Sequence, residues 1–342
     1  MAAPEDAARL IQDAIAELGW TADPAAIAEG VRRLDIGLPA EDEFAVVCSW
    51  LGQCELMHKL DQQQVPVSSR DDFQVPDLMA KFRQAKTPVL IEIKTSQANV
   101  LSFRPDYFKR LERYADMLGL PLLVGWKWNG LWMLFEPKHF RVTDKNHNVS
   151  WKQAMKQNLM GVLAGDVSFT IGEGAALHLS FRKDKLVGSE NHDGSTTEEW
   201  KTVLTDVAFT GYDGERKDNL PIAVQSLLMT SDLDKVDDDK GSHIVSSFIA
   251  TEPRPNFAHR ALVDLLNWEA RDEERPSWRA LLRAPKVSNS VENLRASLDA
   301  ALTNKVVQHV FQVHPHEIPD YVAVDEIEGA TVARLVSAES GR

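Results

Sequence analysis

The sequence has few cysteines, no long apolar run and a deficit of basic charge. Its two cysteines among 342 residues, Cys48 and Cys54, are too few for a disulfide framework or a cysteine-rich zinc module. No uncharged apolar run reaches the length of about 18 residues that crosses a bilayer, so we expect no membrane-spanning helix and no membrane partner. The N-terminus carries early acids and no basic stretch, which argues against a secretory signal. These absences predict a protein of the reducing cytoplasm.

The formal net charge of −13 disfavours nucleic acid as a partner, because phosphate contacts need Lys and Arg. The charge is unevenly distributed, however. Residues 76–145 contain 12 Lys and Arg against 7 Asp and Glu, a local charge of +5 that leaves −18 on the rest of the chain. This segment can therefore meet a phosphate backbone. The chain has no Gly-x-x-x-x-Gly-Lys-Ser/Thr loop, so we expect no ATP-driven activity.

Hydrophobic periodicity divides the chain into four predicted regions. Residues 1–38 form a helical extension, and residues 39–145 combine helices and strands in one α/β unit. Residues 146–256 form a β-rich accessory region, and residues 257–342 form a helical C-terminal region. The predicted fold class is α/β, a mixed sheet flanked by helices, with an additional α+β C-terminal domain.

Local patterns predict the elements of these regions. In the α/β unit, strands are expected over 78–82, 88–94, 122–126 and 131–135, a helix over 105–118, and a hairpin turn at Asn129-Gly130. Farther along, we expect a β-hairpin over 167–181, a polar loop over 187–199 and a mobile acidic segment over 231–242.

The triplet Glu-x-Lys occurs four times, so the triplet alone carries little information. It begins at Glu92, Glu136, Glu199 and Glu215. Only Glu92 lies inside an apolar β run. Residues two apart in a strand share a face, so Glu92 and Lys94 project together while the intervening Ile93 points to the opposite side. The pattern predicts a carboxylate and an ammonium side by side at a strand end.

A hard divalent cation takes several oxygen ligands, so a metal site here needs a second acid. Asp77 precedes Glu92 by 15 residues, a spacing that suits adjacent strands joined by a short connection. Asp77 and Glu92 can then meet across the strand pair.

Pro76-Asp77 followed by Glu92-Ile93-Lys94 at the end of an apolar strand resembles the motif of the PD-(D/E)xK nuclease superfamily. That superfamily includes restriction endonucleases and archaeal-type Holliday junction resolvases. The resemblance covers about residues 40–136 and implies a restriction-endonuclease-like core. It implies that Asp77 and Glu92 bind Mg²⁺ or Mn²⁺ and that Lys94 orients or activates the attacking water.

Many members of the superfamily add a metal-binding glutamate from the first helix. Glu43 is the best match for it, with Glu41 as the alternative. The predicted activity is therefore hydrolysis of DNA phosphodiester bonds. We expect phosphate contacts from Lys81, Arg104, Lys109 and Lys127. A homodimer is expected because cutting two strands takes two active sites, and the acidic remainder of the chain suits a protein partner.

Other interpretations of these residues stay open. Asp77, Glu92 and Lys94 could form a structural ion cluster at a sheet edge. The chain could also be a non-catalytic subunit that keeps the nuclease fold within a multi-protein system for processing nucleic acids. The tryptophans Trp126, Trp128 and Trp132 fit core packing better than stacking on bases.

Overall fold

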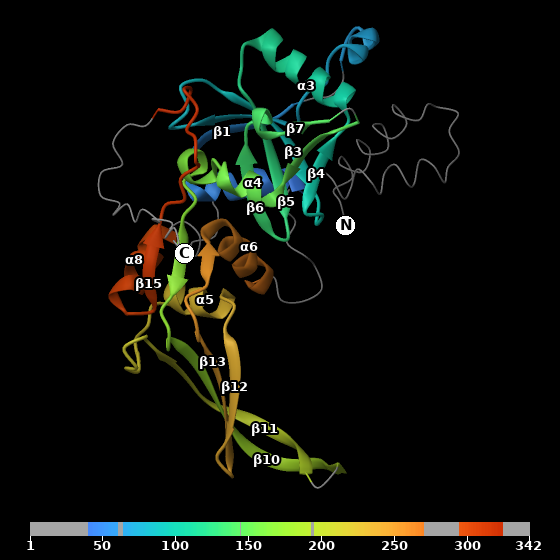
Figure 1. Ribbon diagram of the computed structural model, residues 1–342. Coiled ribbons are helices and arrows are strands. Elements are labelled where there is room, and N and C mark those ends of the chain that lie inside the picture. Colours follow the sequence, from blue (N-terminus) through green and yellow to red (C-terminus); the bar gives the residue numbers. More distant parts are fainter. Residues whose placement is uncertain (1–39, 61–63, 144, 193–194, 270–293, 324–342) are drawn as a thin grey trace, which may run out of the picture. The chain divides into compact units, whose positions relative to one another are not determined.

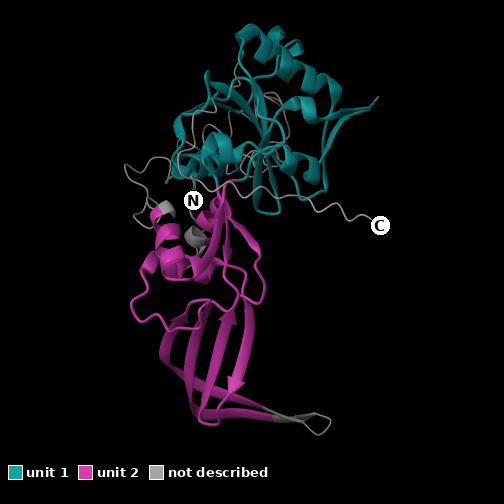
Figure 2. Ribbon diagram, turned by 60° about the vertical axis from the view of Figure 1, so that its left-hand side comes forward, with its two compact units in different colours: residues 1–166, 273–287, 313–328 teal, residues 167–272, 288–312, 329–342 magenta. Residues whose placement is uncertain are grey.

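The computed structural model describes residues 40–60, 64–143, 145–192, 195–269 and 294–323. They form two compact units, shown in Figure 2, which divide the described chain at residue 166 and again between residues 312 and 313. The helices predicted within residues 1–38 lie outside the described residues. No helix in the described part of the chain has the length and apolar character to cross a membrane.

A five-stranded mixed sheet forms the centre of the first unit (Figure 1). Its strands, in spatial order, are β1 (Cys54–Lys59), β2 (Leu78–Phe82), β3 (Val89–Thr95), β5 (Leu122–Trp128) and β6 (Leu131–Phe135). Only β3 and β5 run parallel, and all other neighbours are antiparallel. The crossover through helix α3 (Pro105–Leu118) makes this parallel pairing possible.

Helices cover both faces of this sheet. On one face, Phe108 and Leu111 of α3 pack in one buried cluster with Val124 and Trp126 of β5. The helix over residues 40–51 covers the other face. It approaches closely at Gly125, where an added Cβ would lie 2.7 Å from Cδ1 of Ile93 and 3.6 Å from the ring of Phe44. The predicted mixed sheet flanked by helices is confirmed.

Smaller elements complete the first unit. A second sheet contains β4 (Val100–Phe103), β8 (His147–Ser150) and β7 (Arg141–Val142) in that order. Short helical segments are η1 (Val67–Asp71), η2 (Pro137–His139), α4 (Trp151–Lys156) and η3 (Met160–Ala164). The predicted β5–β6 hairpin turns at Asn129 and Gly130, whose φ angles of 46° and 82° suit a tight turn of the primed type. Trp126 and Trp132 are fully buried, so their predicted role in core packing is confirmed.

The second unit has its own core and two antiparallel sheets. One sheet has the order β11-β10-β13-β12 and the other the order β14-β9-β15. The strands are β9 (Ser168–Ile171), β10 (Ala176–His192), β11 (Ser195–Thr210), β12 (Asp234–Asp239), β13 (His243–Ile249), β14 (Pro255–Phe257) and β15 (Val307–Phe311). The helices are α5 (Ile222–Thr230), α6 (Ala258–Glu269) and α8 (Leu294–Thr303). This α+β unit matches the predicted fold class. The predicted boundaries after residues 38, 145 and 256 stay predictions.

Three local predictions for the second unit are wrong. Strands β9 and β10 do not form a hairpin, because β9 pairs with β14 and β15 and β10 pairs with β11 and β13. Most of the predicted polar loop belongs to the β10–β11 pair, and the acidic segment contains β12. Backbone pairing and cross-strand contacts, such as the 2.6 Å hydrogen bond from Ser246 Oγ to Asp237, override the polar composition.

The core of the first unit predicts a contrast between two leucines of its sheet. Leu123 in β5 is 0% exposed and Leu56 in β1 is 55% exposed. Leu123→Ala should lower the free energy of unfolding by about 2–5 kcal/mol, because it removes buried methyl groups and leaves a cavity. Leu56→Ala should cost less than about 1 kcal/mol. Urea denaturation checks this, and equal losses for the two variants would contradict the assigned core.

Candidate active site

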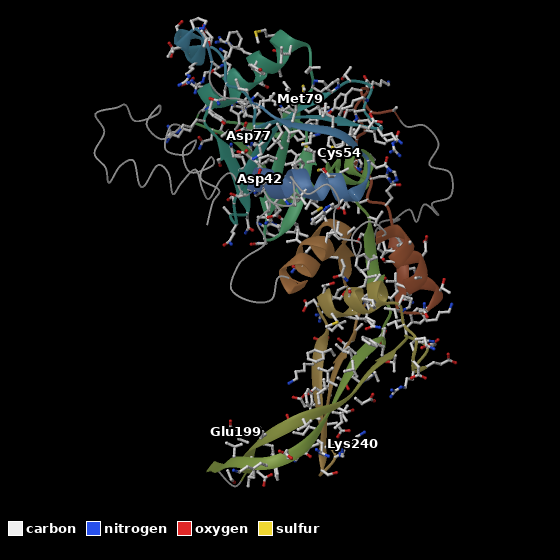
Figure 3. The ribbon with its side chains drawn as sticks, turned by 180° about the vertical axis from the view of Figure 1, so that it is seen from behind. Asp42, Cys54, Asp77, Met79, Glu199 and Lys240 are labelled. Carbon is white, nitrogen blue, oxygen red and sulfur yellow. The ribbon has the colours of Figure 1, made fainter. Side chains whose placement is uncertain are left out.

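The residues of the predicted motif gather where β2 begins beside β3. Asp77 directly precedes β2. Leu78 pairs with Ile91, so the same antiparallel register extended by one residue places Asp77 opposite Glu92. Asp77 Oδ2 accepts a 2.7 Å hydrogen bond from the backbone nitrogen of Ile93. Figure 3 labels Asp77 in the first unit, near the helix that carries Asp42. Antiparallel pairing thus accounts for the 15-residue spacing of the two acids.

Glu92 is 0% exposed, and two donors hold one of its carboxylate oxygens. Oε1 accepts hydrogen bonds from the Tyr107 hydroxyl and from Lys94 Nζ. Oε2 is also buried, and in the described part of the chain it has no hydrogen-bond partner. An unpaired buried carboxylate oxygen is costly, so this atom is suited to bind a positively charged ligand.

The charges of Lys94, Asp77 and Glu92 act on one another. Burial raises the pKa of Asp77 well above its usual range, and repulsion from Glu92 adds to this, while Lys94 opposes both. Burial alone would lower the pKa of Lys94, but attraction to Glu92 and Asp77 outweighs burial and raises it. Lys94 is therefore charged at neutral pH. Its ammonium also lies 5.4 Å from the ring centroid of Tyr107.

Two acids of the helix over residues 40–51 have different surroundings. Glu43 accepts hydrogen bonds from Lys127 Nζ at 2.5 Å and from Trp132 Nε1 at 3.0 Å. Glu41 lies 3.1 Å from Lys59. Burial raises the pKa of Glu41, Lys59 opposes this, and the negative charge of Glu92 adds to the rise.

Residues two apart on an α-helix are separated by about 200° around its axis, so these two acids cannot share one direction. The negative charge of Glu92 acts on Glu41, and Glu43 accepts hydrogen bonds from Lys127 and Trp132. The predicted role of Glu43 at the metal stays a prediction, and this geometry favours the alternative residue, Glu41.

Of the four residues predicted to contact phosphate, two are exposed and two are bound to other protein groups. Arg104 and Lys109 are exposed at the start of α3. Lys81 Nζ instead donates to the carbonyl oxygens of Phe82, at 3.1 Å, and Ala85. Lys127 is paired with Glu43. Binding of nucleic acid by these residues stays a prediction, and Arg104 and Lys109 are the pair with exposed side chains.

The side chains present fit a hard divalent cation that shares its ligands with solvent and substrate. Within the described residues, no three His, Cys, Asp or Glu side chains form a group that could hold a metal on their own. Mg²⁺ commonly binds through one or two carboxylates together with water and substrate phosphate. Asp77 and Glu92 are two carboxylates in suitable positions, and Oε2 of Glu92 is a buried oxygen with no hydrogen-bond partner in the described part of the chain.

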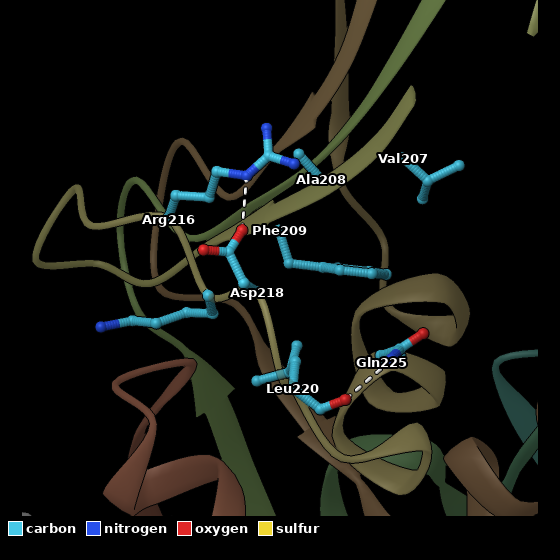
Figure 4. Close-up of a pocket in the computed structure, with 8 residues that line it drawn as sticks. Val207, Ala208, Phe209, Arg216, Asp218, Leu220 and Gln225 are labelled. Carbon is cyan, nitrogen blue, oxygen red and sulfur yellow. Dashed lines mark hydrogen bonds and ion pairs between the residues drawn. The ribbon is translucent and has the colours of Figure 1, made fainter. Parts of the chain in front are cut away.

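A concavity in the second unit, of about 220 Å³, has a different character (Figure 4). Phe209 and Leu220 line it together with Arg216, Asp218 and Gln225. Arg216 Nε donates to Asp218 at 2.7 Å, and Gln225 Nε2 donates to the carbonyl oxygen of Leu220 at 2.7 Å. Because these polar groups bind each other, the concavity gives no comparable indication of a charged ligand.

The different surroundings of the helix acids predict different effects on stability. Glu43→Ala should lower the free energy of unfolding by about 1–3 kcal/mol, because it removes the carboxylate that accepts hydrogen bonds from the buried Trp132 indole N–H and from Lys127. Glu41→Ala should cost less, because Lys59 keeps its ion pair with Asp42. Urea denaturation of the two variants checks this, and a larger loss for Glu41→Ala would contradict it.

Comparison with known proteins identifies the segment that contains this site. Residues 64–165 match the model of the family described as archaeal Holliday junction resolvase (Hjc). Among solved structures, the chain is similar to Hjc of Archaeoglobus fulgidus, titled a Holliday junction resolvase from an archaeal hyperthermophile. The identity is 20% and the TM-score 0.31, over 38% of this chain and 96% of that chain. No curated protein matches. The family match spans Asp77, Glu92 and Lys94, and the resemblance of this segment to the PD-(D/E)xK nuclease superfamily, which its motif predicted, is confirmed.

Proposed function

We propose that the first unit is a divalent-metal-dependent endonuclease that hydrolyses phosphodiester bonds in branched DNA. The convergence of Asp77, Glu92 and Lys94, with Oε2 of Glu92 buried and unpartnered, is the observation that carries this proposal. The resolvase family that residues 64–165 match supports four-way junctions as the substrate class. The local charge of +5 over residues 76–145 suits a phosphate backbone.

Asp77 and Glu92 are the residues that would hold Mg²⁺ or Mn²⁺. When bound, such an ion neutralises charge on the scissile phosphate and makes water a better nucleophile near neutral pH. Lys94 carries its charge beside both carboxylates. From there it can orient the attacking water and stabilise the negative charge that develops on the phosphate. The burial of Glu92 strengthens these interactions, because less water screens them.

Exposed basic residues bind the substrate, and two copies of the chain assemble on it. Arg104 and Lys109 contact the DNA backbone, and Lys81 and Lys127 join them only by leaving their present partners. Two copies of the chain act together, because a junction is resolved by two cuts. The reaction takes place in the cytoplasm, and the acidic remainder of the chain offers a surface for a protein partner.

A cleavage assay with the full chain tests this function. A four-way junction and a linear duplex of the same sequence are incubated with Mg²⁺ or Mn²⁺, and with EDTA. We expect metal-dependent cutting that prefers the junction. Asp77→Asn, Glu92→Gln and Lys94→Ala should each slow it by at least about 10²-fold, because each removes charge that binds the metal or stabilises the transition state.

The matched control for these variants is Asp116→Asn, which removes an exposed acid in the last turn of α3. It should cut at the wild-type rate. Cutting that survives Asp77→Asn and Lys94→Ala would refute the assignment of the site. Junction binding without any cutting under all metal conditions would instead favour the non-catalytic subunit.

A further inference from the structure

Beyond the acids and the lysine, we infer that Tyr107 is a positioning residue that fixes Glu92 in the orientation in which Oε2 faces the cation, an inference that rests on the proposed function. A carboxylate has two equivalent oxygens that exchange when the group rotates. In this site the two differ, since Oε1 accepts from Tyr107 and Lys94 while Oε2 is buried and unpartnered. Saturating one oxygen defines the other as the metal-binding atom.

The ring that carries this hydroxyl is itself held in place. Tyr107 lies in the first turn of α3, just after Pro105 begins the helix. Its ring stacks on Phe103, with centroids 5.9 Å apart and planes 15° from parallel. Phe103 is buried and makes edge contacts with Phe108 and Phe140. The hydroxyl is therefore presented to Glu92 from a fixed aromatic cluster rather than from a flexible chain.

The phenol suits this role because it remains a donor. A phenol has a pKa of about 10, so it is protonated at neutral pH. The Tyr107 hydroxyl therefore keeps its proton and acts as a hydrogen-bond donor to Glu92. Lys94, the second donor, is more adaptable, because its side chain is flexible and part-exposed. A hydrogen bond from Tyr107 leaves Lys94 able to move toward water or phosphate without releasing Glu92.

Tyr107→Phe removes the hydroxyl and keeps the ring. We expect its Mn²⁺ affinity, measured by calorimetry without DNA, to fall about 10-fold or more, as when other groups that orient metal ligands are lost. The Mn²⁺ concentration for half-maximal junction cutting should rise by the same factor, and saturating Mn²⁺ should restore most of the rate. Junction affinity in EDTA should not change. A residue that only stabilised the fold would not give this rescue by metal.

The matched control is Tyr114→Phe, a hydroxyl loss on the same helix at a ring that packs against the same core. It should keep the wild-type Mn²⁺ affinity. Circular dichroism verifies folding, and if Tyr107→Phe does not fold, Tyr107→Leu, which also lacks a donor, replaces it in the same titration. A folded Tyr107 variant with wild-type Mn²⁺ affinity would overturn the inference while the proposed nuclease stands. A wild-type protein that neither binds Mn²⁺ nor cuts would overturn the proposed function itself.

Discussion

A carboxylate that is buried away from water needs hydrogen-bond donors or cations to balance its negative charge. In the described part of the chain, Glu92 has such partners on one of its two oxygens. Lys94 and Tyr107 both bind Oε1, and Oε2 has no partner in the described part of the chain. The surrounding elements maintain this asymmetry. Strand β3 buries the side chain, β2 brings Asp77 opposite it, and α3 supplies the tyrosine. A half-compensated buried charge destabilises a protein unless a ligand completes it, which is why it points to a function.

The helix over residues 40–51 shows how one element can serve both structure and site. Glu43 binds Lys127 and Trp132 and so ties the helix to β5 and β6. Glu41 lies in a different direction, pairs with Lys59 and feels the charge of Glu92. Neutralising Glu43 therefore tests how the helix packs on the sheet, and neutralising Glu41 tests the electrostatics of the site.

The parts of the site that follow from strand geometry could be predicted from the sequence. The parts that depend on which way a helix turns its side chains could not. Alternation within β3 predicts that Glu92 and Lys94 share a face, and the 15-residue spacing predicts that Asp77 meets Glu92. Tyr107 lies next to Phe108 in α3. No pattern in the local sequence shows that its hydroxyl donates to Glu92 of β3. In the second unit, β10 to β13 pair through polar residues, so composition predicted loops where non-local backbone hydrogen bonds form strands.

The proposed site requires that Oε2 of Glu92 binds the metal, and anomalous diffraction from a crystal of the protein with Mn²⁺ locates the ion directly. We expect one anomalous peak about 2.0–2.3 Å from Oε2 and within binding distance of a carboxylate oxygen of Asp77, while Tyr107 keeps its hydrogen bond to Oε1. No peak at saturating Mn²⁺, or a structure in which Oε2 is bonded to a protein donor instead, would contradict it.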